Sequence, residues 1–242
     1  IPEAKIKVIY NFIPPLPKAN RDDVRKMLGV SSTDIVVGSI GRASPEKNFA
    51  LLIDAANAVI KCRQNVRFIL VGGGNQLAYL KQYAHEIGLS DKFIFTDYRA
   101  DARNLLQGFD IFVNTSIWES FGNAPIEAAL AEIPVIAPWV DGLPEAIGIQ
   151  NSGILLTPTK PINQPKFNHI RQIPKLGLIK GQLATPLELD RNELKESILE
   201  LVDNPLLRKQ YGQAAKMRAE QLFTFSRYQD ETENLYELAI NS

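Results

Sequence analysis

Two carboxylates bracket a Phe-Gly pair near the middle of the chain, with seven residues between Glu119 and Glu127. The stretch 109–116 before them predicts a short buried strand that runs into a polar loop, and 124–131 predicts a buried helix. Open parallel sheets bind ligands where strand ends meet helix starts. Free N–H groups at a helix start attract phosphate, and carboxylates accept hydrogen bonds from sugar hydroxyls. The spacing therefore predicts a site for a molecule that carries both phosphate and hydroxyl groups.

Two more predicted strand ends carry residues suited to phosphate. Arg42 and Lys47 follow the apolar run 35–40, and they offer a forked donor and a point charge to phosphate oxygens. The alternative is a pair of surface charges. Gly72-Gly73-Gly74 follows the run 66–71, but the third glycine of a dinucleotide fingerprint would fall at Leu77. These glycines are therefore interpreted as the lining of a nucleotide pocket.

The motif Glu-x-Phe-Gly followed by a second Glu resembles the donor-site motif of retaining glycosyltransferases of the GT-B fold, family 4 type. The resemblance covers most of the chain, because four segments match in the right order at compatible spacings. They are Gly41-Arg42 with Glu46-Lys47-Asn48, Leu70-Val71-Gly72-Gly73-Gly74, the Glu119–Glu127 stretch, and Ile133-Pro134-Val135-Ile136-Ala137 with Gly142-Leu143-Pro144-Glu145.

The resemblance implies roles for individual residues. Arg42 and Lys47 would clamp the diphosphate of a nucleotide-sugar, and Glu119 would contact the transferred sugar and help to hold the transition-state charge, so these three form the expected catalytic set. Glu127 would accept hydrogen bonds from the ribose; the alternative is an ordinary acid in a helix's first turn. The other expected nucleotide-sugar contacts are Gly41, Gly72, Gly73, Tyr98, Arg99, Ser116, Phe121, Gly122 and Asn123.

By the same resemblance, the protein would transfer a sugar from a UDP- or GDP-type donor to a sugar, polysaccharide or lipid-linked acceptor with retention, as in polysaccharide biosynthesis. We expect no cofactor and no metal, because cationic side chains replace the metal and no Asp-x-Asp motif occurs. Two alternatives stay open. One is a non-catalytic nucleotide-sugar binding module, and the other is a different GT-B enzyme, such as a sugar-nucleotide epimerase or a phosphorylase.

The amino-acid composition limits the kinds of partner and binding site that this protein could have. Lys and Arg number 27, as do Asp and Glu, so no net positive field indicates nucleic acid. The single cysteine, Cys62, excludes an internal disulfide and a cysteine-based metal cluster. No apolar run approaches the ~20 residues that span a bilayer. We expect a cytoplasmic protein, and a peripheral contact with the cytoplasmic face of a membrane is left open.

The order of apolar runs and helical stretches predicts the architecture. Short β-branched runs alternate with helical patterns, which indicates an α/β fold with one doubly wound parallel sheet of Rossmann type, followed by C-terminal helices. The expected strands are 35–40, 66–71, 92–95, 111–113, 135–137 and 153–156, and the expected helices are 49–60, 75–84, 101–106, 124–131 and the region from 191 onward, with breaks at 204–205 and 223–224.

The resemblance also implies that the chain consists of three parts. Residues 1–18 are similar to an interdomain segment, 19–222 to the donor-binding domain, and 223–242 to a C-terminal helix that packs toward an N-terminal domain absent here. The segment 157–186 has five cationic residues, no acid and no strand or helix periodicity. It is interpreted as an insertion, either a solvated loop or a flap that binds an anion or acceptor.

Three departures from the family pattern leave the base and the sugar open. Asp141-Gly142 stands where the family usually has Gly-Gly, and Glu132 and Asp97 replace usual glycines.

Overall fold

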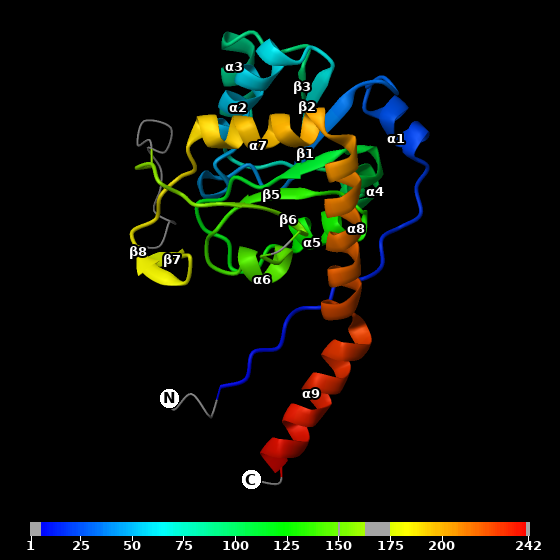
Figure 1. Cartoon of the computed structure of the whole chain (residues 1–242), viewed down its shortest axis with the longest axis vertical. Coiled ribbons are helices and arrows are strands. Elements are labelled where there is room, and N and C mark those ends of the chain that lie inside the picture. The colour runs from blue at the N-terminus through cyan, green and yellow to red at the C-terminus, as the bar shows by residue number, and fades with distance from the viewer. Residues whose placement is uncertain (1–5, 150, 163–174, 241–242) are drawn as a thin grey trace.

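The computed structural model describes residues 6–149, 151–162 and 175–240. A six-stranded parallel sheet forms the centre, in the order β3-β2-β1-β4-β5-β6, and confirms the predicted α/β class (Figure 1). This is the strand order of a doubly wound Rossmann-type sheet. The strands are β1 Ile35–Ile40, β2 Val66–Val71, β3 Phe93–Phe95, β4 Ile111–Val113, β5 Val135–Pro138 and β6 Gly153–Leu156.

The strands are short and apolar because helices cover both faces of the sheet. Successive residues point to opposite faces, so Val36 joins one core and Val37 the other. Pairing of Val37 with Ile111 sets β1 beside β4. The chain leaves β1 in one direction and β4 in the other, so the carboxyl ends of these two strands mark the switch point of the sheet.

Helices form two layers, one on each face (Figure 1). One layer holds α2 Phe49–Cys62, α3 Leu77–Glu86 and α7 Arg191–Asp203. The other holds α1 Arg21–Met27, α4 Ala102–Leu105, α5 Asn123–Leu130, α6 Leu143–Ile147 and α8 Pro205–Leu222. The short 3-10 turns η2 Pro45–Lys47 and η3 Leu106–Gly108 precede α2 and follow α4.

Local capping explains several of the helix boundaries. Asp190 accepts hydrogen bonds from the amides of Asn192 and Glu193 at the start of α7, and Asn204 caps α8 before Pro205. The sequence also favoured Asn75 as the cap of the expected helix 75–84, and this is wrong, since α3 starts at Leu77 and its N-cap residue, Gln76, makes no side-chain capping bond. The sequence patterns also missed α1 and α6, which are only seven and five residues long.

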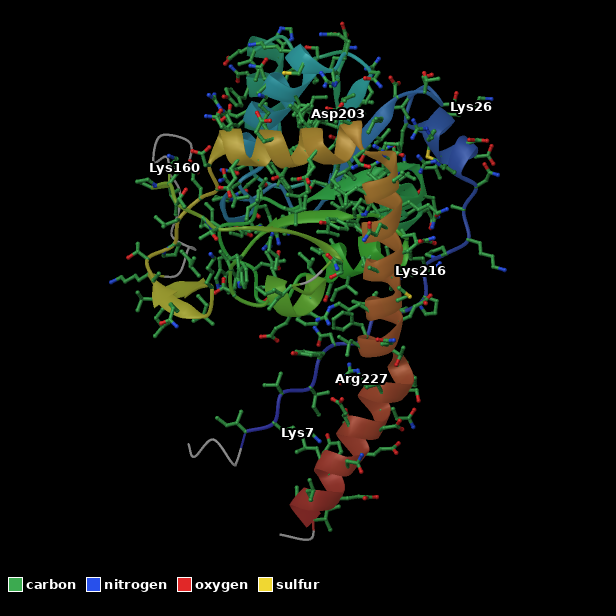
Figure 2. All side chains as sticks on the ribbon, in the orientation of Figure 1. Lys7, Lys26, Lys160, Asp203, Lys216 and Arg227 are labelled. Carbon is green, nitrogen blue, oxygen red and sulfur yellow. The ribbon has the colours of Figure 1, made fainter. Side chains whose placement is uncertain are left out.

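The N-terminal segment passes the start of the last helix, α9 Phe225–Ile240, which extends away from the sheet (Figure 1). The amide of Ile13 donates to the carbonyl of Phe223 at 2.9 Å, and Arg227 donates to the carbonyl of Tyr10 at 2.6 Å (Figure 2). No residue of α9 is buried, although Leu238 and Ile240 are apolar. That α9 packs toward a further domain stays a prediction.

The segment 157–186 contains a β-hairpin, so the expectation of no regular structure is wrong for part of it. Strands β7 Gly177–Ile179 and β8 Gln182–Ala184 pair in antiparallel fashion. Lys160 pairs with Asp190 at 3.0 Å, near the start of α7 (Figure 2). Lys166 and Arg171 lie outside the described residues. The ion pair with Asp190 offsets the charge of Lys160, one of the five cationic residues of this segment.

No helix within the described ranges is long and apolar enough to cross a membrane.

Candidate functional site

Two adjoining pockets open at the carboxyl ends of the central strands. The Glu119 pocket has a volume of about 280 Å³, and Gly41, Arg42, Lys47, Glu119 and Phe121–Asn123 line it. The glycine pocket has a volume of about 530 Å³, and Gly41, Arg42, Gly72–Gly74, Tyr98 and Arg99 line it. Gly41 and Arg42 border both pockets. The two pockets together offer a groove for an elongated ligand.

Lys47 and Glu119 form an ion pair inside the Glu119 pocket. Their side chains are 22% and 15% exposed, so water screens the pair only in part. The hydroxyl of Ser116 lies 3.3 Å from the same carboxylate oxygen of Glu119. The pocket thus contains one ammonium group and one carboxylate, each with an exposed face that a ligand can reach.

Two hydrogen bonds, one from a side chain and one from a backbone amide, hold together the two loops that carry this pair. The Thr115 hydroxyl donates to the carbonyl of Lys47 at 2.7 Å, and the Ile117 amide donates to the carbonyl of Glu46 at 2.8 Å. The loop after β1 and the loop after β4 are therefore bound to each other along their length. The geometry of the ion pair depends on this contact between distant parts of the chain.

Arg42 stands at the rim of the pockets with its side chain 73% exposed. Its guanidinium lies 3.3 Å from the carboxylate of Glu46, which is buried and accepts a 2.6 Å hydrogen bond from the Ser44 hydroxyl. Burial alone would raise the pKa of Glu46, but the bonds from Ser44 and from its own backbone amide, together with Arg42, lower it overall. Glu46 is therefore an ionised partner for a largely exposed arginine.

We expect Glu46→Gln to lower the free energy of unfolding at pH 7 by about 1 kcal/mol, because it removes a charge that Ser44 and Arg42 stabilise. The folded pKa lies below the unfolded value, so this contribution is complete above the unfolded pKa and disappears as the pH falls through the folded pKa. Urea unfolding at several pH values measures it. A loss of equal size at pH 2 and pH 7 contradicts the assignment, and Glu196→Gln on α7 is the control.

Two glycines allow chain segments at the strand ends to pack closely against one another. Gly72 has a φ of +145°, and a Cβ there would lie 1.9 Å from the carbonyl oxygen of Gly41. Gly122 has a φ of +101°, and it precedes α5. Both positions require glycine for the backbone to approach as closely as it does. Gly122, Asn123 and Ala124 line the Glu119 pocket, so the amino terminus of α5 borders it.

Glu127 lies one turn into α5 and is not among the residues that line the two pockets. Its side chain is 18% exposed, and its carboxylate lies 3.1 Å from Nε of Arg103. Burial raises the pKa of Glu127, and the charge of Arg103 opposes that rise. Of the residues proposed from the sequence, Glu127 and Ser116 line neither pocket. Ser116 instead supports Glu119.

The glycine pocket carries the aromatic and cationic pair expected near a base. Tyr98 is 79% exposed, so its ring is free to stack on a planar ligand. Arg99 is held by Asp101 through two hydrogen bonds of 2.6 and 2.7 Å. Tyr98 is therefore better placed than Arg99 to meet a ligand.

Sequence reasoning missed several residues that line or support the Glu119 pocket. Asn11 reaches the pocket from the N-terminal segment, and Asn114 and Ser120 come from the loop after β4 that also carries Glu119. Asn114 follows β4 directly, a position that could have been noticed from the strand prediction. Asn11 carried no such signal, because its placement depends on packing of the N-terminal segment. Within the described parts of the chain, no group of three or more His, Cys, Asp or Glu residues could hold a metal ion.

Comparison with known proteins gives a consistent family match. Residues 20–165 match the family described as glycosyl transferases group 1. An uncharacterized glycosyltransferase of Methanocaldococcus jannaschii is 30% identical over 168 residues, which are 66% of this chain and 43% of that protein. The lipopolysaccharide core biosynthesis mannosyltransferase LpsB of Rhizobium meliloti is 30% identical over 60% of this chain and 42% of its own length.

Solved structures agree on the fold. Anabaena HepE, in complex with UDP and glucose, is 28% identical with a TM-score of 0.74, covering 95% of this chain and 56% of HepE. The C-terminal domain of a group 1 family glycosyl transferase from Francisella tularensis has a TM-score of 0.65 at 20% identity, covering 87% of this chain and 96% of that domain. The chain thus spans less than half the length of the two curated relatives above and just over half of HepE.

Proposed function

Because this chain belongs to the glycosyl transferases group 1 family, we propose that it is the donor-binding half of a glycosyltransferase that takes a sugar from a nucleoside diphosphate and transfers it with retention of anomeric configuration. The observation that carries the proposal is the Lys47–Glu119 pair beside the amino terminus of α5. A cation and a helix start suit a diphosphate, and a carboxylate suits sugar hydroxyls. This combination favours a phosphate-linked sugar over a free nucleotide.

In this proposal, different residues bind the diphosphate, the sugar and the nucleoside of the donor. The diphosphate would lie between Arg42, Lys47 and the first amides of α5, which stabilise the negative charge that develops on the leaving group. The sugar would lie against Glu119, where positive charge develops at the anomeric carbon. The nucleoside would occupy the glycine pocket, with its base on Tyr98. Gly72 and Gly73 also line this pocket.

UDP-glucose is the first donor to test, since HepE was solved with UDP and glucose. Because the relative LpsB is named a mannosyltransferase, a nucleoside diphosphate mannose is the second donor to test, with GDP-mannose as the form to use first. Titration calorimetry of this chain against UDP, GDP and ADP should give one preferred diphosphate. Sugar transfer requires the full-length protein, because we propose that the acceptor, whether a sugar, a polysaccharide or a lipid-linked glycan, binds on a further domain beyond α9 and the N-terminal segment.

Retention and metal independence are tested in the same assay. Proton NMR of the first-formed product should show the anomeric configuration of the donor, and inversion would contradict the proposal. EDTA should leave turnover unchanged, because Arg42, Lys47 and the α5 amides supply the positive charge that a metal would otherwise supply. Binding of a nucleotide-sugar without turnover in the presence of candidate acceptors would instead favour a non-catalytic binding module.

The family resemblance implies a ribose contact for Glu127, whose carboxylate pairs with Arg103 in this structure. If that contact forms when a nucleotide binds, Glu127→Ala should weaken nucleoside diphosphate binding by about 1.5 kcal/mol, because a charged acceptor for ribose hydroxyls is lost. The loss should be absent for a 2′,3′-dideoxy nucleoside diphosphate, which has no such hydroxyls to donate. Calorimetry with both ligands measures the difference, and Glu200→Ala on the exposed face of α7 is the control. Equal losses for the two ligands would show that Glu127 acts only through Arg103 and the fold.

A further inference from the structure

We propose that Asp141 is a positioning residue for Glu119, and that the β7–β8 hairpin in turn holds the side chain of Asp141 in place. The proposal rests on the proposed function, since it assigns Asp141 a part in orienting the group that meets the transferred sugar. It also assigns a task to the insertion 157–186. The hairpin would set the geometry of the sugar site rather than only cover the surface.

The side chain of Asp141 joins two parts of the chain. One carboxylate oxygen accepts a 2.8 Å hydrogen bond from the amide of Leu178 in β7. The other accepts a 3.3 Å hydrogen bond from the amide of Glu119. A single carboxylate thus bridges the hairpin and the loop that carries Glu119, and both bonds are of the charge-assisted kind.

Backbone bonds support both sides of this bridge. The Asp141 amide donates to the carbonyl of Leu178 at 2.9 Å, and the Gly142 amide donates to the carbonyl of Glu119 at 3.3 Å. Val140 forms an isolated antiparallel bridge with Ile179. The hairpin is therefore bonded to the 140–141 segment, and we infer that its position is transmitted to Glu119 through Asp141.

The tip of the hairpin also contacts the segment after β5, through Lys180. The Lys180 amide donates to the carbonyl of Trp139 at 3.2 Å, and the Lys180 ammonium lies 5.4 Å from the centre of the Trp139 ring, within range of a cation–π contact. Lys180 is therefore engaged with the domain and is not a free cation for an anionic acceptor. This arrangement favours a supporting role for the hairpin over electrostatic recruitment.

Asp141 itself has a φ of +42°, a conformation that Asn and Gly adopt more readily than Ala. Asp141→Gly therefore removes the carboxylate without adding backbone strain, and Asp141→Asn keeps one oxygen acceptor. Glu119 retains its contacts with Lys47 and Ser116 in both variants. Its carboxylate should then stay near the site but lose its fixed orientation.

The activity test compares both variants with wild type in the full-length protein. Asp141→Gly should lower kcat by about five- to tenfold, the effect of one lost hydrogen bond, while the Kd of the nucleoside diphosphate stays within about twofold. Asp141→Asn should lie between wild type and Asp141→Gly. Leu183→Ser, at an exposed hairpin position, is the control and should match wild type. A wild-type kcat in Asp141→Gly overturns the proposal.

Two further measurements separate positioning from general stability. Replacing 176–184 with a short Gly/Ser linker should lower kcat by a similar factor, and adding Asp141→Gly to that variant should change it little, because the two act as one support. Additive losses overturn the coupling.

Amide hydrogen exchange, measured on this chain, requires no turnover. The Glu119 and Leu178 amides should exchange faster in Asp141→Gly, and unchanged rates overturn the bridge. If wild type transfers no sugar from any donor, the proposed function fails, and the exchange result alone decides the role of Asp141.

Discussion

Glu119→Gln is expected to lower the kcat of sugar transfer by about 10²–10³-fold, the range seen when one transition-state stabilising group is removed. Glutamine keeps the size of the side chain but not its charge. In the proposed mechanism that charge faces the anomeric carbon, where positive charge develops as the diphosphate departs. The loss should therefore fall on kcat more than on the KM of the donor.

Nucleoside diphosphate affinity should not fall in the same variant. A carboxylate beside a diphosphate repels it, and Glu119 also competes with the diphosphate for Lys47. Removing the charge frees Lys47 for the ligand. Calorimetry with the nucleoside diphosphate and steady-state kinetics with the intact donor separate the two effects. Glu196→Gln, in the unrelated ion pair of Lys195 and Glu196, is the control. If nucleoside diphosphate affinity and kcat fell by the same factor in Glu119→Gln, the proposal that Glu119 contacts the sugar would be wrong.

Lys47→Ala is expected to weaken nucleoside diphosphate binding by about 1.5–3 kcal/mol, roughly 10- to 150-fold, because a charge-assisted bond to phosphate is lost. Affinity for the nucleoside without phosphates should change far less. The variant also leaves Glu119 without its ammonium partner in a partly buried site. Its uncompensated charge then repels the diphosphate, which adds to the loss.

A matched lysine serves as the control for this variant. The Lys195 side chain is 24% exposed and paired with Glu196, against 22% for Lys47, and it lines neither pocket. Lys195→Ala should bind the diphosphate as wild type does. Arg42→Ala should have a smaller effect than Lys47→Ala, since Arg42 is 73% exposed and holds its position less firmly. Unchanged diphosphate affinity in Lys47→Ala rules out the clamp.

Local patterns were enough to predict much of the fold. The strands 35–40, 66–71, 111–113 and 153–156 were predicted with the bounds that the structure has, because continuous apolar runs mark strands buried on both faces. The helix breaks near 204 and 223 also followed from local residues. Short helices such as α6 and the β7–β8 hairpin were missed, because five residues hold too little periodicity and the Gly/Pro-rich surroundings of the hairpin hide its alternation.

The sequence by itself determined the kinds of group available: two carboxylates, two cations and glycines at predicted strand and helix ends. Only the tertiary structure decided which of them meet. Lys47 and Glu119 are 72 positions apart, and the pairing of β1 with β4 brings them together. Glu127 faces Arg103 rather than a pocket, and Asp141 joins Glu119 to the hairpin. Periodicity and capping are local properties of the chain, whereas such contacts depend on strand order and packing between distant segments.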